Sequence, residues 1–331
     1  MAAAAVFRAL AKVTALAAAS VLLVRAAPAW GAPTATAVEQ GYDAGDLQSP
    51  RAMAMGGNLY ASGTSTTGLY QNPAALPLAR MYHMEALASF APEAGRQSYG
   101  GAIVDSMTNR LAGGVAYAWT QLDPEGVRRE WHDLRVSLAY PLTERFAVGL
   151  TGRYLHVDQP VSRGPFGASL PSDGTPKAPL FNNVTVDLGV AAALTEQLRL
   201  GIAGKNLTNT GTGLAPLLVG GGVAYVTRDF TLEADGQADI TTFRTPVPRL
   251  SGGAEVFLLD RVALRAGYRF EGGLRTHAVT FGVGYVDKTW SVELGGRRDV
   301  AGTATPVTFL SVALRYFYDG GRSEGGRAPE E

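Results

Sequence analysis

The sequence predicts an all-β protein, a transmembrane antiparallel β-barrel of about 14 strands. Three observations lead to this prediction: an N-terminal export signal, a long series of segments in which apolar and polar residues alternate, and connections that alternate between short and long. The composition agrees, since glycine is frequent at 41 of 331 residues and cysteine is absent. The 29 basic residues balance the 29 acidic ones, so no nucleic-acid partner is indicated.

Residues 1–37 are predicted to be a secretory signal peptide. Arg8 and Lys12 form a basic start, and an apolar run follows at residues 13–24. This run is shorter than the roughly 20 residues that a membrane-spanning helix needs, and small residues suitable for cleavage come after it. An uncleaved membrane anchor is the alternative, and Arg25 disfavours it by interrupting the run. We therefore expect export from the cytoplasm of a Gram-negative cell and localisation to the outer membrane.

From residue 81 to residue 318 the chain alternates with a period of two. In the segment 261–271, for example, Val262 and Leu264 lie on one face, whereas Arg265 lies on the other. Segments of this kind run for about ten residues, which is typical of tilted strands that cross a bilayer. The pattern predicts barrel strands at 81–91, 97–106, 110–121, 130–141, 145–157, 183–194, 197–207, 216–226, 229–241, 249–258, 261–271, 275–286, 289–298 and 306–318.

The predicted connections differ in length on the two sides of the barrel. Short joints such as 108–109 and 287–288 alternate with longer ones at 122–129, 158–182, 208–215, 242–248 and 299–305. Short periplasmic turns and longer outer loops are expected of outer-membrane barrels, as are the aromatic residues that end several apolar rows. A secreted β-sandwich or propeller is the alternative, and it explains neither feature. Residues 319–331 have no apolar period and are predicted to form a disordered periplasmic tail.

Charged residues of both signs occupy the predicted inner faces of the strands. If the apolar faces meet lipid, the lumen receives Glu85, Asp133, Arg135, Arg153, Asp187, Arg199, Lys205, Glu233, Asp235, Asp239, Glu255, Arg261, Arg265, Arg269, Glu293, Arg297 and Arg315. We expect the acids of 229–241 to pair with the arginines of 261–271 across a narrow lumen. These charges either stabilise the barrel and its contents or, in a second interpretation, form a selective eyelet for an anionic solute around Arg265 and Arg269.

The stretch from Ser49 to Leu76 differs from the rest of the chain. It contains Arg51-Ala52 before Gly56-Gly57, and then Asn72-Pro73-Ala74 shortly before the first strand. This spacing resembles the N-terminal hatch of FadL-type outer-membrane barrels and their PorV-type relatives. The resemblance implies that residues 38–80 form a hatch inside the lumen, with Arg51, Gly56, Gly57, Asn72, Pro73 and Ala74 as its motif. The acidic pair that precedes N-P-A in FadL-type proteins is replaced here by Ser65-Thr66-Thr67.

The same resemblance implies two alternative functions. FadL-type proteins pass hydrophobic molecules across the outer membrane, so one expected partner is a small hydrophobic molecule. PorV-type barrels are scaffolds or shuttles that hold exported proteins in a secretion or surface assembly, so an exported protein is the alternative partner. Outer-membrane lipid and, during biogenesis, the barrel-assembly machinery are expected partners in both cases.

No group of residues indicates catalysis. The four histidines, His83, His132, His156 and His277, lie on different segments, and none has metal-ligand spacing with another ligand. Nucleophile, zinc-protease and phosphate-loop motifs do not occur in the sequence. We therefore expect neither an enzyme nor a bound metal or cofactor.

Overall fold

The computed structural model describes residues 47–122, 129–158, 163–164, 167–168, 181–208, 215–243, 245–303 and 306–318. Within these ranges, fourteen strands form one closed antiparallel barrel, in which each strand pairs with its neighbours in sequence and β1 pairs with β16. The strands are β1 (Tyr82–Ala91), β2 (Arg96–Asp105), β3 (Ala112–Leu122), β4 (Arg129–Pro141), β5 (Phe146–Asp158), β8 (Phe181–Ala193), β9 (Leu198–Lys205), β10 (Leu218–Val226), β11 (Phe230–Asp239), β12 (Val247–Leu258), β13 (Val262–Glu271), β14 (Thr276–Val286), β15 (Trp290–Ala301) and β16 (Thr308–Tyr318). The predicted fold class is confirmed, and each predicted strand corresponds to one of these.

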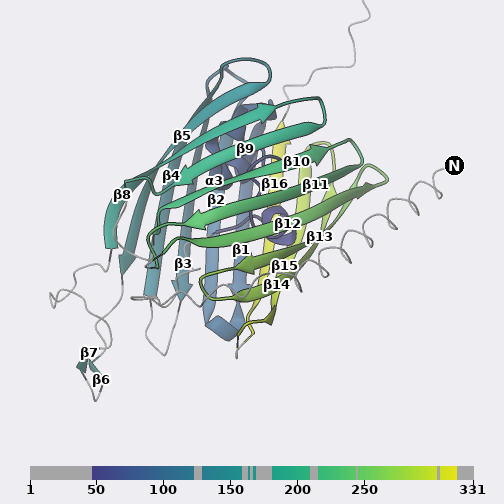
Figure 1. The fold of residues 1–331 in the computed structure, drawn as a ribbon. Coiled ribbons are helices and arrows are strands. Elements are labelled where there is room, and N and C mark those ends of the chain that lie inside the picture. Colours follow the sequence, from purple (N-terminus) through teal and green to yellow (C-terminus); the bar gives the residue numbers. More distant parts are fainter. Residues whose placement is uncertain are drawn as a thin grey trace, which may run out of the picture.

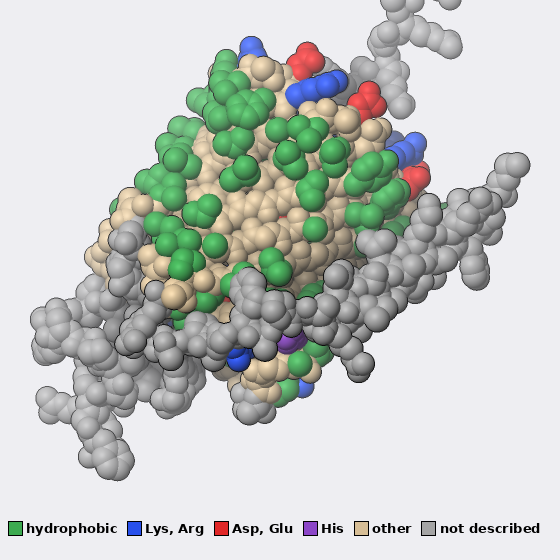
Figure 2. All heavy atoms as spheres, viewed as in Figure 1, with side chains coloured by type: hydrophobic (Ala, Val, Ile, Leu, Met, Phe, Trp, Pro, Cys, Tyr) green, Lys and Arg blue, Asp and Glu red, His purple; other side chains and the backbone are tan. Residues whose placement is uncertain are grey.

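The barrel wall separates side chains by type, as the alternation in sequence requires. On β5, for example, Leu150 and Tyr154 are exposed on the outside, whereas Thr151 and Arg153 are buried on the inside. Figure 2 shows apolar side chains spread over the wall, with the charged ones confined to its ends. Outward-facing apolar side chains are stable only against hydrocarbon, which identifies the outer surface as the lipid-facing one.

The connections follow the predicted asymmetry only in part. On the side of the barrel where β1 begins and β16 ends, every connection between strands is short, from 106–111 to 287–289. The opposite side carries the longest connection, 159–180, which includes a small hairpin of β6 (Arg163–Gly164) and β7 (Gly167–Ala168). That side also has two four-residue connections, 92–95 and 272–275, so the alternation is less strict than expected. Residues with positive φ, Gly95 and Arg275, make these two connections tight.

The chain before β1 forms short helices inside the barrel. They are α2 (Pro50–Ala54), α3 (Ser65–Gln71) and the 3₁₀ helix η2 (Pro73–Leu78). The Ser49 side chain accepts a hydrogen bond from the Ala52 N–H and so caps α2. In Figure 1 these helices lie within the ring of strands, in agreement with their contacts: α2 packs on β13–β16, α3 on β1–β3 and η2 on β3–β5 and β8. We call residues 47–80 the N-terminal segment.

Strand β8 pairs unequally with its two neighbours. Strand β8 pairs with β5 along nearly its whole length, but it pairs with β9 only from Leu188 to Ala193. Beyond the end of β9 the chain still runs beside β8, since the Leu207 N–H donates to the Val186 carbonyl oxygen at 2.8 Å and the Asn206 N–H to the Asp187 side chain at 2.7 Å.

Two predicted regions lie outside the described residues: the signal peptide at 1–37 and the tail at 319–331. The first part of the predicted hatch, residues 38–46, also lies outside them. Among the residues that are described, no helix has both the length and the apolar character needed to cross a membrane.

Candidate functional site: the filled lumen

The N-terminal segment touches the wall through glycines that face the lumen. Gly253 on β12 and Gly267 on β13 lie opposite each other and both contact the backbone of Met55. A Cβ atom at Gly253 would lie 2.6 Å from the Met55 carbonyl oxygen, and one at Gly267 would lie 2.7 Å from the Met55 carbonyl carbon. The next pair also faces α2: a Cβ atom at Gly295 would lie 2.5 Å from the Pro50 carbonyl oxygen, and one at Gly282 would lie 2.6 Å from the Ala54 Cβ. Only glycine allows this approach of one backbone to another.

A similar glycine pair receives the Asn72-Pro73-Ala74 motif on the opposite side of the lumen. Gly149 on β5 and Gly189 on β8 are cross-strand partners. A Cβ atom at Gly149 would lie 2.4 Å from the Ala74 nitrogen, and one at Gly189 would lie 2.1 Å from the Asn72 side-chain oxygen. The motif is therefore seated in a gap that two glycines leave in the wall.

The remaining hatch-motif residues have defined contacts. Asn72 donates from Nδ2 to the carbonyl oxygens of Tyr60, at 2.9 Å, and Val190, at 3.0 Å, and its Oδ1 accepts from the Ala74 N–H. Pro73 occupies the first position of η2, where a missing N–H costs nothing. Gly56 and Gly57 have φ values of +97° and +108° and so require glycine where the chain leaves α2. The side chain of Arg51 extends from α2 to the wall, where it forms an ion pair of 2.8 Å with Glu255.

Five buried charges of alternating sign form a row around the wall. Arg265 on β13 pairs with Glu255 on β12 at 2.6 Å and with Glu293 on β15 at 2.9 Å. Arg315 on β16 pairs with Glu293 at 2.7 Å and with Glu85 on β1. The row therefore crosses the junction of the first and last strands and helps to close the barrel.

A glycine allows this row to pass over β14. Gly284 lies between Arg265 and Glu293, and a Cβ atom there would lie 3.2 Å from the Arg265 Nη1. The N-terminal segment joins the row at both ends, through Arg51 at Glu255 and through Thr66, whose hydroxyl donates to Glu85 at 3.1 Å. Each buried carboxylate is thus shared between cations or hydroxyls, as buried charges require.

Glu233 and Asp235 of β11 bind the N-terminal segment, whereas we expected them to pair with the arginines of β13. Glu233 accepts from the backbone N–H groups of Ala61, at 2.8 Å, and Ser62, at 3.1 Å, and Asp235 accepts from the Tyr60 N–H at 3.1 Å. The N-terminal segment fills the space across which the pairing was expected. Arg265 instead binds Glu255 on β12 and Glu293 on β15, and Arg269 lies near Glu271 on its own strand.

The structure places the other predicted lumen charges as follows. Asp239 and Arg249 form a buried pair of 3.2 Å, and Arg269 lies 3.5 Å from Glu271. Asp187 accepts from the Asn206 N–H at 2.7 Å, and the Arg297 guanidinium lies 3.9 Å from the centre of the Phe309 ring. These four predicted residues, Asp187, Asp239, Arg269 and Arg297, are all buried on the inner face.

One prediction about an individual arginine differs from the structure. Arg261 was expected in the lumen, but its side chain is 58% exposed at a turn and donates to the Tyr285 hydroxyl at 3.1 Å. The second interpretation, an eyelet around Arg265 and Arg269, stays a prediction; in the structure two glutamates bind the Arg265 guanidinium. Arg261 has the spacing of an inward-facing residue, but strand β13 begins only at Val262. Arg261 therefore lies in the turn before the strand.

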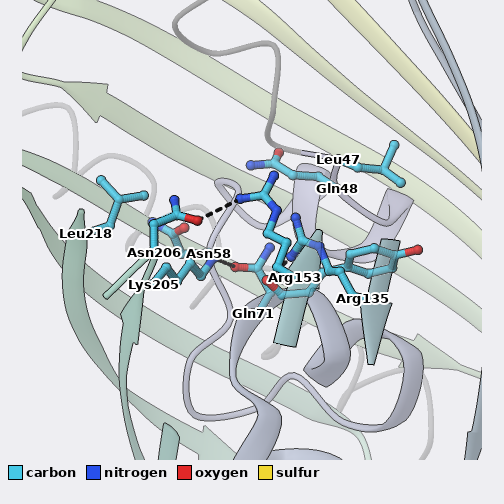
Figure 3. Close-up of a pocket in the computed structure, with 10 residues that line it drawn as sticks. Leu47, Gln48, Asn58, Gln71, Arg135, Arg153, Lys205, Asn206 and Leu218 are labelled. Carbon is cyan, nitrogen blue, oxygen red and sulfur yellow. Dashed lines mark hydrogen bonds between the residues drawn. The ribbon is translucent and has the colours of Figure 1, made fainter. Parts of the chain in front are cut away.

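A second cluster of charges surrounds a small cavity. Asp133 pairs with Arg135 at 2.8 Å and with Arg153 at 2.7 Å, and Arg153 donates to the Asn206 side-chain oxygen at 3.1 Å. Figure 3 shows both arginines with Gln71, Lys205 and Asn206 around this cavity, whose volume of about 10 Å³ is room for one water molecule. The sequence predicted that Arg135 and Arg153 face the lumen, but it did not single out Gln71 and Asn206, because uncharged polar residues carry no distinctive signal.

Tyr70 closes the cavity from the N-terminal segment. Its ring lies 5.2 Å from the Arg135 guanidinium, and Arg135 also donates to the Tyr70 carbonyl oxygen at 3.4 Å. Burial raises the pKa of the Tyr70 phenol well above its ordinary value, so the group stays neutral. Among the described residues, no cluster of three or more His, Cys, Asp or Glu side chains has the arrangement of a metal site.

Fold and site together define a transmembrane β-barrel whose own N-terminal segment fills its lumen. No protein-family model and no curated protein matches the sequence. Solved structures of FadL-family outer-membrane transporters share the fold. The toluene transporter TbuX of Ralstonia pickettii has 14% sequence identity and a TM-score of 0.57, with 82% of this chain and 98% of that chain covered.

Two further solved structures share the fold to a similar degree. The toluene transporter TodX of Pseudomonas putida has 15% identity and a TM-score of 0.57, covering 83% of this chain and 99% of that chain. A FadL homologue of Pseudomonas aeruginosa has 11% identity and a TM-score of 0.57, covering 81% of this chain and 98% of that chain. The fold implied by the FadL-type resemblance is therefore confirmed, and at these identities the likeness concerns the fold.

Proposed function

We propose that the protein is a FadL-like channel of the outer membrane that passes small, mainly hydrophobic molecules. The observation that carries this proposal is the likeness of the whole barrel to transporters, which covers 98% and 99% of the TbuX and TodX chains. The lipid-facing apolar surface supports an outer-membrane location, because the exposed rows of the wall need hydrocarbon.

Residues 38–80 act, in this proposal, as a hatch that closes the axial path. Support comes from the contacts of residues 47–80 with the wall: the Met55 backbone against two glycines, the Arg51–Glu255 ion pair and the seat of Asn72 on β8. The cavity between the N-terminal segment and the wall, beside Arg135 and Arg153, has room for about one water molecule. Passage of a solute therefore requires movement of the N-terminal segment or of the wall.

Uptake by intact cells tests the proposal. Gram-negative cells that express the protein are compared with cells carrying an empty vector for initial uptake of labelled toluene at low concentration. We expect faster toluene uptake with the protein and unchanged uptake of sucrose, since the closed lumen should not admit a hydrophilic solute. Equal toluene uptake in both cell types would contradict the channel function, and recovery of the protein in a detergent-free soluble fraction would contradict the location.

A scaffold function is the second candidate. The observation that favours it is the dense packing of the lumen with ion pairs, such as Arg265 with Glu255 and Glu293, which leaves little room for a solute. A scaffold would hold an exported protein and would need no solute path. Purification of the barrel from outer membranes distinguishes the two functions: a protein that co-purifies in stoichiometric amount supports the scaffold, and a bound small apolar molecule supports the channel.

A further inference from the structure

Two acidic side chains of β11 lie together beneath the N-terminal segment. Glu233 and Asp235 are two residues apart on the inner face of the strand, and both are buried. Three consecutive N–H groups of the segment, those of residues 60–62, donate to them. The two carboxyl groups are themselves within hydrogen-bonding distance of each other. They therefore form one acidic pair, which binds the segment through its backbone.

The charges around the acidic pair do not neutralise it. The titratable groups that face it are Arg51 on α2, Tyr60 of the segment, Arg199 and Lys205 on β9, and Glu255 on β12. Arg51 binds Glu255 at 2.8 Å, and Lys205 donates to Gln71 at 3.2 Å. In the part of the chain that the structure describes, no ion pair joins these cations to the acidic pair. The positions opposite it on the two neighbouring strands are uncharged: Gly222, Ala224, Ser251 and Gly253.

One oxygen of the acidic pair lacks a donor. Asp235 is only 6% exposed, and its Oδ2 has no hydrogen-bond partner, whereas its Oδ1 accepts from the Tyr60 N–H. Two carboxylates in contact at a buried site repel each other, so such pairs hold one proton between them. A protonated carboxyl group is a hydrogen-bond donor, and a proton needs no cavity. One proton therefore removes half of the charge and supplies the missing donor.

We propose that Glu233 and Asp235 share one proton at neutral pH and that this proton keeps the N-terminal segment closed over them. With the proton, the acidic pair carries a single negative charge, to which the N–H groups of residues 60–62 donate. Without it, two negative charges face each other behind the segment, and the repulsion is relieved when the segment moves and water enters. The acidic pair is thus a pH-sensitive latch. This proposal rests on the hatch function proposed above and adds its regulation.

The direction of the pH effect follows from proton binding. A carboxyl group in water releases its proton at about pH 4, so an opened and hydrated acidic pair holds no proton at neutral pH, whereas the closed pair holds one. Closing the segment therefore takes up one proton. Because of this uptake, rising pH favours the open state by up to about tenfold per pH unit until the closed pair also loses its proton.

Infrared spectroscopy of the purified barrel detects the shared proton directly. At pH 7 the wild type should show the carbonyl stretch of a protonated carboxylic acid. Asp235→Asn should lose this band, because Glu233 alone would be ionised, and Glu233→Gln should lose it for the corresponding reason, so the test remains if one variant fails to fold. A wild-type spectrum without the band, or a band that persists in either variant, would overturn the proposal.

Asp260→Asn is the control for both variants. The Asp260 side chain is 64% exposed and pairs with Arg228 at a turn, far from any need for a shared proton. This variant should keep the wild-type band. Loss of the band in Asp260→Asn would overturn the assignment of the proton to the acidic pair.

Planar-bilayer recording tests the latch itself. The open probability of the wild type and of Asp260→Asn should increase from pH 6 to pH 8, by up to about tenfold per unit. Asp235→Asn should stay nearly closed over this range, because the asparagine amide replaces the protonated acid. Equal responses of the wild type and Asp235→Asn would overturn the latch. Toluene uptake tests the channel function separately, and the infrared band does not depend on it.

Discussion

Neighbouring residues on one strand of this barrel meet opposite environments. On β13, Leu264 is 40% exposed on the lipid side, whereas Arg265 is buried between two glutamates of the lumen. The alternation in sequence predicted which way these residues face. It did not predict the partners of the charged ones, because pairing depends on strand register and on what fills the lumen.

Substitutions at these two positions should therefore act differently. Leu264→Arg should lower the free energy of unfolding in lipid vesicles by up to about 2–4 kcal/mol, the cost of an arginine near the bilayer midplane, and leave ion conductance unchanged. Arg265→Leu should instead increase conductance, because Glu255 and Glu293 lose the cation that they share. Urea titration and planar-bilayer recording measure the two effects. Identical behaviour of the two variants would show that the facing is misassigned.

The wall glycines provide a second contrast at the scale of single residues. Gly149→Ala should destabilise the barrel by about 1–3 kcal/mol, because its Cβ would overlap the Ala74 backbone. Gly152 lies three residues along the same strand and has open space around the position of a Cβ atom, so Gly152→Ala is the control and should be tolerated. The temperature at which the folded band disappears on gels reports stability. Equal temperatures for the two variants would contradict the close fit of the N-terminal segment.

These glycines also show what the sequence could not reveal. Their high number was evident from composition, but glycines that contact the N-terminal segment cannot be told from those that face lipid, such as Gly152, without the register. Gly56 and Gly57 were singled out because a glycine pair stands out in a motif. The glycines that receive the segment belong to ordinary alternating strands and carry no such signal.

The strands were predicted far better than the N-terminal helices, for a physical reason. A strand between lipid and a polar lumen must alternate, so β13 and β16 appear clearly in the sequence. The helices α2 and α3 are buried on all sides by the wall, so no amphipathic pattern marks them. The Ser49 cap marks the start of α2 and the Asn72 cap marks the start of η2, whereas Thr64, at the start of α3, makes no side-chain capping hydrogen bond.

The last strand gives a prediction at the scale of whole elements. Strand β16 pairs with β1 from Tyr82 with Tyr318 to Phe90 with Leu310, and so closes the barrel. Deletion from Asp319 onward should leave assembly intact, whereas deletion from Val312 onward should abolish it, because most of this pairing is lost. Heat-modifiability in outer-membrane fractions measures assembly. The reverse pattern would mean that another strand closes the barrel.

For the molecule as a whole, the N-terminal segment and the wall stabilise one another. The segment supplies N–H groups to Glu233 and Asp235, a cation to Glu255 and a hydroxyl to Glu85. The wall in turn has glycines where the backbone of the segment packs against it, and the Val190 carbonyl oxygen accepts a hydrogen bond from Asn72. A charged lumen without the segment would leave several buried carboxylates short of partners, so we expect the segment to remain in place in the resting state.

Ion conductance in planar lipid bilayers tests this account most directly. The intact protein should be nearly closed, because the segment fills the lumen and leaves a cavity of about 10 Å³. A variant that lacks residues 50–76 removes α2, α3 and the Asn72-Pro73-Ala74 motif, and it should show large, stable openings once its folding has been verified on gels. Large openings in the intact protein would contradict the account, since they would show that the N-terminal segment does not occlude the barrel.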